Sequence, residues 1–156
     1  MRLKPITLKT ILPCLRLRVQ RNQRHLIAPM YVSLLQSIHP RAYPMGIYAN
    51  DALVGFLLYG HFHYNGAARW FISRVMVDQH HQRQGYGRQA MQLAIHRLVS
   101  EHQAREIWLS YSPDNGVAIK LCDSLGFVPT GEATHGEVVV CLQTTSFAHI
   151  QEGHTL

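Results

Sequence analysis

A short glycine-bearing loop between a predicted strand and a predicted helix constrains this chain more than any other feature. The strand is predicted over 70–77 and the helix over 88–102, which leaves 78–87 as the loop. Gly85 and Gly87 lie at its end, and glycine lets backbone N–H groups approach a ligand closely. The start of a helix adds unpaired N–H donors and about half a positive charge. The segment therefore predicts an anion site suited to a diphosphate.

Length and composition favour one folded domain over 1–143, followed by a polar tail over 144–156. The 156 residues are 47% hydrophobic and 15% charged, which excludes a disordered or collagen-like chain. No apolar run reaches the ~18 residues of a membrane span. The three cysteines, Cys14, Cys122 and Cys141, are widely spaced and form no CxxC pair, so neither a disulfide framework nor a zinc cluster is indicated. We therefore expect the protein to lie in the reducing cytoplasm.

The positive charge is concentrated in the first third of the chain. The net charge is +6, and residues 1–50 hold eight Lys or Arg and no Asp or Glu. Residues 51–156 hold seven Lys or Arg and nine Asp or Glu. Such a field attracts anions, including nucleotides, phosphates and nucleic acid. A solvated basic face that serves solubility explains the same pattern.

The order of the predicted elements favours an α/β fold with a mixed, mostly antiparallel sheet and helices on both faces. Helical pieces are predicted within 9–39 and a further helix between Asn115 and about Leu125. The strand–loop–helix–strand unit 70–111 predicts one parallel strand pair. The remaining predicted strands are 1–8, 45–48, 53–61, 127–130 and 138–142, with a loop over 131–136 in the last hairpin.

Other known phosphate-binding patterns do not fit the loop. The dinucleotide fingerprint GxGxxG is incomplete because Ala90 stands at its third position, and no Gly-Lys-Ser/Thr follows as in a P-loop. Arg83 and Arg88 add charge and forked donors for phosphate. For two glycines alone, an ordinary turn into a helix remains the simpler interpretation.

Two motifs, one in this loop and one about 30 residues further on, support each other. Gln82-x-x-Gly85-x-Gly87 follows a Val-Met-Val strand and resembles Q/R-x-x-G-x-G/A, the coenzyme A signature of the GNAT superfamily of N-acetyltransferases. The segment 115–127, Asn-Gly-Val-Ala-Ile-Lys-Leu-Cys-Asp-Ser-Leu-Gly-Phe, is similar to its Asn-x-x-Ala-x-x-Leu-Tyr-x-x-x-Gly-Phe. The likeness covers about 45–143. A looser likeness over 19–34 and 74–78 resembles the diamine and polyamine acetyltransferase branch.

The resemblance implies acetyl-CoA as co-substrate, lying between the strands 70–77 and 107–111, which splay apart. A primary amine then attacks the thioester directly, and a backbone N–H near Val75 polarises the thioester oxygen. The coenzyme-binding residues that the resemblance implies are Val75, Met76, Val77, Gln82, Arg83, Gln84, Gly85, Tyr86, Gly87, Arg88 and Asn115.

The expected catalytic residues are Cys122, Tyr111 and Asp78. Cys122 stands where the superfamily usually has the Tyr that protonates the leaving thiolate, and a thiol can donate a proton. Cys122 is alternatively a small buried helix residue, in which case Tyr111 serves as the proton donor. An acyl-enzyme on Cys122 is disfavoured because no histidine is evidently placed to pair with it.

The acceptor is the least constrained part of the prediction. A polyamine pocket needs carboxylates, and Glu132 and Glu137 are the candidates for substrate binding. Residues 1–50 contain no Asp or Glu that could bind ammonium groups. The acceptor can therefore also be a mono-amine, an amino acid, a peptide or an anionic molecule.

The function predicted is acetyl-CoA-dependent acetylation of a small amine or polyamine. A non-catalytic acyl-CoA sensor of the same fold is the alternative. A nucleic-acid binder is disfavoured because no known motif supports it, and the histidine pairs 80–81 and 61/63 lack a third metal ligand. No membrane partner is expected, and pairing into a homodimer is an expectation by analogy only.

Overall fold

The computed structural model describes residues 1–26 and 30–145. In this part of the chain it has a seven-stranded sheet with the order β1-β2-β3-β4-β5-β7-β6. The elements in chain order are β1 (Arg2–Pro5), α1 (Leu8–Leu15), η1 (Arg21–Gln23), α2 (Met30–Gln36), β2 (Ala42–Ala49), β3 (Ala52–Tyr64), β4 (Ala67–Val77), α3 (Tyr86–His102), β5 (Glu106–Tyr111), α4 (Gly116–Ser124), β6 (Val128–Thr134) and β7 (Glu137–Gln143).

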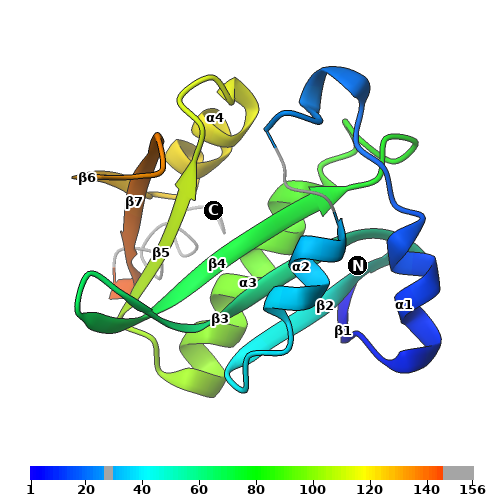
Figure 1. The fold of residues 1–156 in the computed structure, drawn as a ribbon, viewed down its shortest axis with the longest axis horizontal. Coiled ribbons are helices and arrows are strands. Elements are labelled where there is room, and N and C mark those ends of the chain that lie inside the picture. The colour runs from blue at the N-terminus through cyan, green and yellow to red at the C-terminus, as the bar shows by residue number, and fades with distance from the viewer. Residues whose placement is uncertain (27–29, 146–156) are drawn as a thin grey trace, which may run out of the picture. The chain divides into compact units, whose positions relative to one another are not determined.

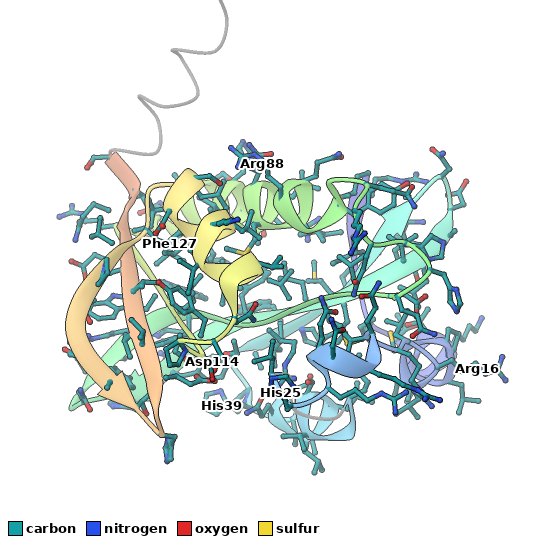
Figure 2. All side chains as sticks on the ribbon, turned by 90° about the horizontal axis from the view of Figure 1, so that it is seen from above. Arg16, His25, His39, Arg88, Asp114 and Phe127 are labelled. Carbon is teal, nitrogen blue, oxygen red and sulfur yellow. The ribbon has the colours of Figure 1, made fainter. Side chains whose placement is uncertain are left out.

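The chain forms two compact units, the first made of Met1–His61 and Ile72–Ala94. Its strands β1, β2 and β3 are antiparallel neighbours. Asn50 and Asp51 join β2 to β3 with φ values of 46° and 69°, as in a two-residue hairpin turn. In this unit α1 and α2 lie on one face of the sheet and the first turns of α3 lie on the other (Figures 1 and 2).

The core of the first unit explains why β3 carries a continuous apolar run. Residues 54–60 are all buried, since helices cover both faces of the sheet there. Phe56 and Leu58 pack in one cluster with Met76 of β4. Leu17 and Val19, from the segment after α1, are buried in the same cluster. The chain between α1 and η1 is thus anchored in the core by its apolar side chains.

The second unit comprises Phe62–Phe71 and Ile95–Leu156. Here β7 pairs antiparallel with both β5 and β6. The parallel register of β4 with β5 consists of the pair Phe71–Trp108. The parallel pair predicted from the segment 70–111 is therefore confirmed, as is the mixed α/β fold class.

The last hairpin differs from its prediction in one respect. The loop predicted over 131–136 is wrong, because β6 runs on to Thr134 and β7 begins at Glu137. The register shifts between Pro129 and Ala133, and Gly131 in that stretch has φ = 82°. A bulge absorbs extra residues in one strand without ending the ladder.

Some expectations fall outside these observations. Residues 27–29, within the stretch 9–39 where helical pieces are expected, and most of the tail expected over 144–156 lie outside the described residues. The single domain over 1–143 stays a prediction. Among the described residues, the helices are too short or too polar to cross a bilayer.

The close approach of β3 and β4 at Gly55 yields a test of the packing of the first unit. A Cβ on Gly55 would lie 2.3 Å from the carbonyl oxygen of Met76, so Gly55→Ala must push β3 and β4 apart. We expect a loss of about 1–3 kcal/mol in the free energy of unfolding, as for other overpacked sites. Urea denaturation measures it.

The control is Gly116→Ala at the first turn of α4, where an added Cβ meets nothing within 4 Å. Its free energy of unfolding should be unchanged or slightly higher, because alanine favours a helix over glycine. Equal stabilities for the two variants would contradict the packing described for Gly55.

Candidate functional site

The loop after β4 turns sharply into α3. Gly85 has φ = 77° and Arg83 has φ = 63°, both in the left-handed region. The amide of Gln89 donates to the carbonyl of Gly85 at 3.1 Å, which fixes Gly85 as the residue before the first helical turn. The N–H groups of that first turn therefore have no carbonyl partner within the helix. Left-handed residues next to a helix start form concave N–H clusters that bind anions.

The two glycines of the loop have different reasons to be there. Gly85 needs no side chain because of its positive φ. A Cβ on Gly87 would meet its nearest neighbour, Val77 Cγ2, at an ordinary 3.9 Å. Neither crowding nor the left-handed region requires glycine at 87, so its effect is to leave the start of α3 uncovered. An uncovered helix start can be approached by a phosphate group.

Gln82, the first residue of the glycine motif, closes the loop with its amide. Its Nε2 donates to the carbonyl of Val77 at 3.0 Å and to Oε1 of Gln23 at 2.9 Å. The side chain thus joins the end of β4 to the loop and to η1. These two hydrogen bonds are compatible with the predicted role of Gln82 in coenzyme binding, because they fix the shape of the loop.

Asp78 shapes the start of the loop. The side chain is buried; Oδ2 accepts from the backbone N–H of Arg18 at 2.9 Å and Oδ1 from that of His80 at 3.1 Å. His81 Nδ1 lies 3.7 Å from Oδ1. Both oxygens therefore have backbone donors, and the catalytic role expected for Asp78 stays a prediction. The partnership with Arg18 had no signal in the sequence, since 60 residues separate the two.

In the second unit, Asn115 caps α4. Its Oδ1 accepts from the N–H of Ala118 at 3.1 Å, the usual contact of an N-cap asparagine. Figure 2 marks Asp114 and Phe127 on either side of this helix. The cap accounts for the Asn of the second motif by itself, and its predicted contact with the coenzyme stays a prediction.

Cys122 and Tyr111, the two expected proton donors, are both buried in the second unit. Burial, with a smaller contribution from Asp123, raises the pKa of the Cys122 thiol to about 12. Burial also raises the pKa of Tyr111, and the negative charges that Cys122 and Asp123 can carry add to this. Both groups hold their protons at neutral pH. A thiol with so high a pKa is a poor nucleophile, which disfavours an acyl-enzyme on Cys122.

The two expected acceptor-binding carboxylates each have a partner within the second unit. Glu132 accepts from Asn65 Nδ2 at 3.0 Å, and its Oε1 lies 3.9 Å from Arg69 Nη1. The Arg69 guanidinium stacks 3.8 Å from the centre of the Trp108 ring. Glu137 accepts from the Ser110 hydroxyl. Within the described residues, no group of three His, Cys, Asp or Glu is placed to hold a metal ion.

A parallel strand pair linked by a helix, with unpaired N–H groups at the start of that helix, is an α/β arrangement whose helix start can accept an anionic ligand. The family model for the Acetyltransferase (GNAT) family matches residues 13–127, and the chain belongs to this family. It is therefore an N-acetyltransferase, with acetyl-CoA as its co-substrate.

Two curated relatives have similar length and related names. The chain is 33% identical over 132 residues to the probable spermine N(1)-acetyltransferase of Bacillus subtilis subsp. natto (strain BEST195). It is 32% identical over 132 residues to the spermine/spermidine N(1)-acetyltransferase of Bacillus subtilis (strain 168). Each alignment covers 81% of this chain and 87% of the relative.

Solved structures share the fold at lower identity. The spermidine N-acetyltransferase of Vibrio cholerae, in complex with CoA and spermine, matches with a TM-score of 0.72 and 16% identity. That match covers 94% of this chain and 97% of the other. Mycobacterium smegmatis RimJ in complex with CoA-disulfide matches with the same TM-score and identity. That match covers 97% of this chain and 88% of the other. At this identity the likeness shows the fold alone.

The raised pKa of Cys122 predicts how stability depends on pH. The unfolded thiol titrates near 9.0 and the folded one near 12, so the folded state retains the proton longer between these values. The contribution of Cys122 to stability is complete below pH 9 and is lost as pH rises towards 12. Between pH 8 and 10.5, the urea concentration at the unfolding midpoint should therefore fall more steeply for the wild-type protein than for Cys122→Ala.

The difference between the two proteins below pH 8 is the internal control, because no thiol titrates there and the difference should be constant. Parallel curves up to pH 10.5 would contradict the burial of the thiol.

Proposed function

We propose that the loop from Gln82 to Arg88 holds the diphosphate of acetyl-CoA. The observation that carries this proposal is the turn at Gly85, after which the first N–H groups of α3 have no carbonyl partner in the helix and lie next to Gly87, which has no side chain. The backbone of Val75, Met76 and Val77 then pairs with the pantetheine arm as an added strand would. Arg83 and Arg88, both exposed, supply charge around the phosphates.

The charge of the first unit supports an anionic ligand there. Its sequence holds eleven Lys or Arg against two Asp or Glu. The sequence of the second unit holds four Lys or Arg and seven Asp or Glu. A coenzyme that carries several phosphate charges is attracted to the first kind of surface.

A carboxylate placed in the loop tests the diphosphate assignment. Gly85→Asp would set a negative charge against the phosphates, and we expect acetyl-CoA binding to weaken by about 10- to 100-fold, the effect of a close like charge near a protein surface. Calorimetric titration with acetyl-CoA measures it.

The matched control is Gly66→Asp in the turn between β3 and β4. Gly66 has φ = 78° and open space around it, so the control carries the same strain and the same charge outside the loop. It should bind acetyl-CoA as wild type does. Unchanged affinity in folded Gly85→Asp would exclude the loop as the diphosphate site.

For the chemistry, we propose direct attack of the acceptor amine on the thioester, with the N–H of Val75 polarising the carbonyl. The new C–N bond replaces the C–S bond, and Cys122 or Tyr111, both protonated at neutral pH, gives its proton to the coenzyme thiolate. The proton that the amine nitrogen loses restores this donor through solvent. Asp78 stays a proposed catalytic residue, and its hydrogen bonds from the backbone N–H groups of Arg18 and His80 also fix the start of the loop. The three cysteines are unpaired, which supports a reducing cytoplasm as the compartment.

We further propose that the acceptor is a polyamine. The names of the two curated relatives support this class, and so does the acidic balance of the second unit. Glu132 and Glu137 are the residues we assign to the acceptor's ammonium groups. The partner described for Glu137 is the neutral hydroxyl of Ser110, whereas the cation of Arg69 faces Glu132.

An acceptor panel tests this assignment. Thiol release from acetyl-CoA should be fastest with spermine or spermidine, slower with putrescine, and negligible with amino acids or a basic peptide. Glu137→Gln should raise KM for the polyamine about 10-fold, because a charged hydrogen bond is worth about 1.5–3 kcal/mol.

Glu101→Gln is the control, because Glu101 forms an exposed pair with Arg97 at 3.9 Å, and it should leave KM unchanged. Acetyl-CoA binding without thiol release by any amine would instead indicate a coenzyme sensor. Faster turnover of a mono-amine than of spermidine would overturn the polyamine assignment.

A further inference from the structure

Gln23 of η1 contacts the coenzyme loop through a single side chain. Its Oε1 accepts from Nε2 of Gln82 at 2.9 Å, and that same nitrogen donates to the carbonyl of Val77 at 3.0 Å. We propose that Gln23 is a positioning residue for acetyl-CoA binding and acts by holding the Gln82 amide in place. This inference rests on the proposed assignment of the diphosphate to the loop.

The geometry fixes which way the Gln82 amide points. The carbonyl of Val77 can only accept, so the Gln82 nitrogen must face it. An amide nitrogen has two N–H groups, and Gln23 receives the second. With both N–H groups engaged, the side chain is held between the end of β4 and η1, and the loop from 78 to 82 is closed across its base.

The segment that carries Gln23 is itself fixed to the same loop. The backbone N–H of Arg18 donates to Asp78 at 2.9 Å, and its carbonyl accepts from the N–H of Gln79 at 2.6 Å. Leu17 and Val19 on either side are buried in the core. The short helix η1 follows at once, and its amide of Gln23 donates to the carbonyl of Gln20 at 2.9 Å.

One short segment therefore holds the loop at two places, at its start through Arg18 and at Gln82 through Gln23. A loop held in shape before the ligand arrives loses less conformational entropy on binding. The expected signature of Gln23 is thus an effect on acetyl-CoA affinity with little effect on the chemical step.

The first experiment replaces Gln23 by methionine, which has similar length and no strong acceptor. One neutral hydrogen bond is worth about 0.5–1.5 kcal/mol, so Gln23→Met should raise Kd and KM for acetyl-CoA about 3- to 10-fold. The value of kcat at saturating acetyl-CoA should stay within about 2-fold of wild type, since the side-chain contact described for Gln23 is with Gln82 and not with Cys122, Tyr111 or Val75.

Asn22→Met is the matched control, because Asn22 is the exposed neighbour in η1. It should leave Kd, KM and Tm unchanged. An equal rise in Kd for both variants would mean that any methionine in η1 disturbs binding. That result would overturn the positioning role of Gln23. If Gln23→Met fails to fold, Gln23→Ala repeats the measurement with the control Asn22→Ala.

A double-variant cycle tests whether Gln23 acts through Gln82. Gln82→Met removes both hydrogen bonds, so adding Gln23→Met to it should change Kd by less than about 2-fold. Effects of the two substitutions that simply multiply would overturn the positioning role. A fall in kcat with unchanged KM in Gln23→Met would overturn it as well.

The failure of this inference is distinguishable from that of the proposed function. If Gly85→Asp weakens acetyl-CoA binding as expected while Gln23→Met leaves it unchanged, the loop is the site and Gln23 does not position it. If neither substitution changes Kd, the diphosphate assignment itself is wrong.

Discussion

The hydrogen bond from the Gln82 amide to the carbonyl of Val77 is the interaction on which the candidate coenzyme site depends. It joins the last residue of β4 to a position five residues further on, so that the chain can return through Gly85 into α3. Without that closure, the first helical N–H groups and the end of β4 would not be held in register with each other. Backbone donors can bind an anion only when their directions are fixed.

The division of charge between the two units complements the two substrates proposed for the protein. The first unit is strongly basic and carries the loop, while the second is acidic and carries Glu132 and Glu137. A polyanionic coenzyme and a polycationic acceptor are attracted to surfaces of opposite sign, and such fields act on encounter rates before any specific contact forms. Both attractions should weaken as salt is added.

The sequence predicted the fold class and the parallel strand pair because strand and helix periodicities are local signals. It placed the start of the helix after the loop at Arg88, two residues later than the observed start of α3 at Tyr86, since capping preferences act over a few residues. It did not predict that β6 continues through Gly131, because a positive φ in a strand and a positive φ in a loop look alike in sequence.

The site was predictable only where its residues are neighbours in the chain. The motif 82–87 identified the loop, but nothing in the sequence linked Gln82 to Gln23 or Asp78 to Arg18. Those contacts depend on how the segment after α1 packs through Leu17 and Val19. The stacking of Arg69 on Trp108, and its approach to Glu132, likewise arise from strands that are brought together only in the folded chain.

The burial of the three cysteines has a consequence for a protein that handles a thioester. Acyl exchange onto a protein sulfur requires the thiolate form. Because the pKa is raised to about 11 for Cys14 and Cys141 and to about 12 for Cys122, on the order of one thiol in several thousand or fewer is ionised at pH 7.5. Buried and protonated, these three sulfur atoms are poor acceptors for an acyl group, whereas a neutral amine needs no ionisation before it attacks.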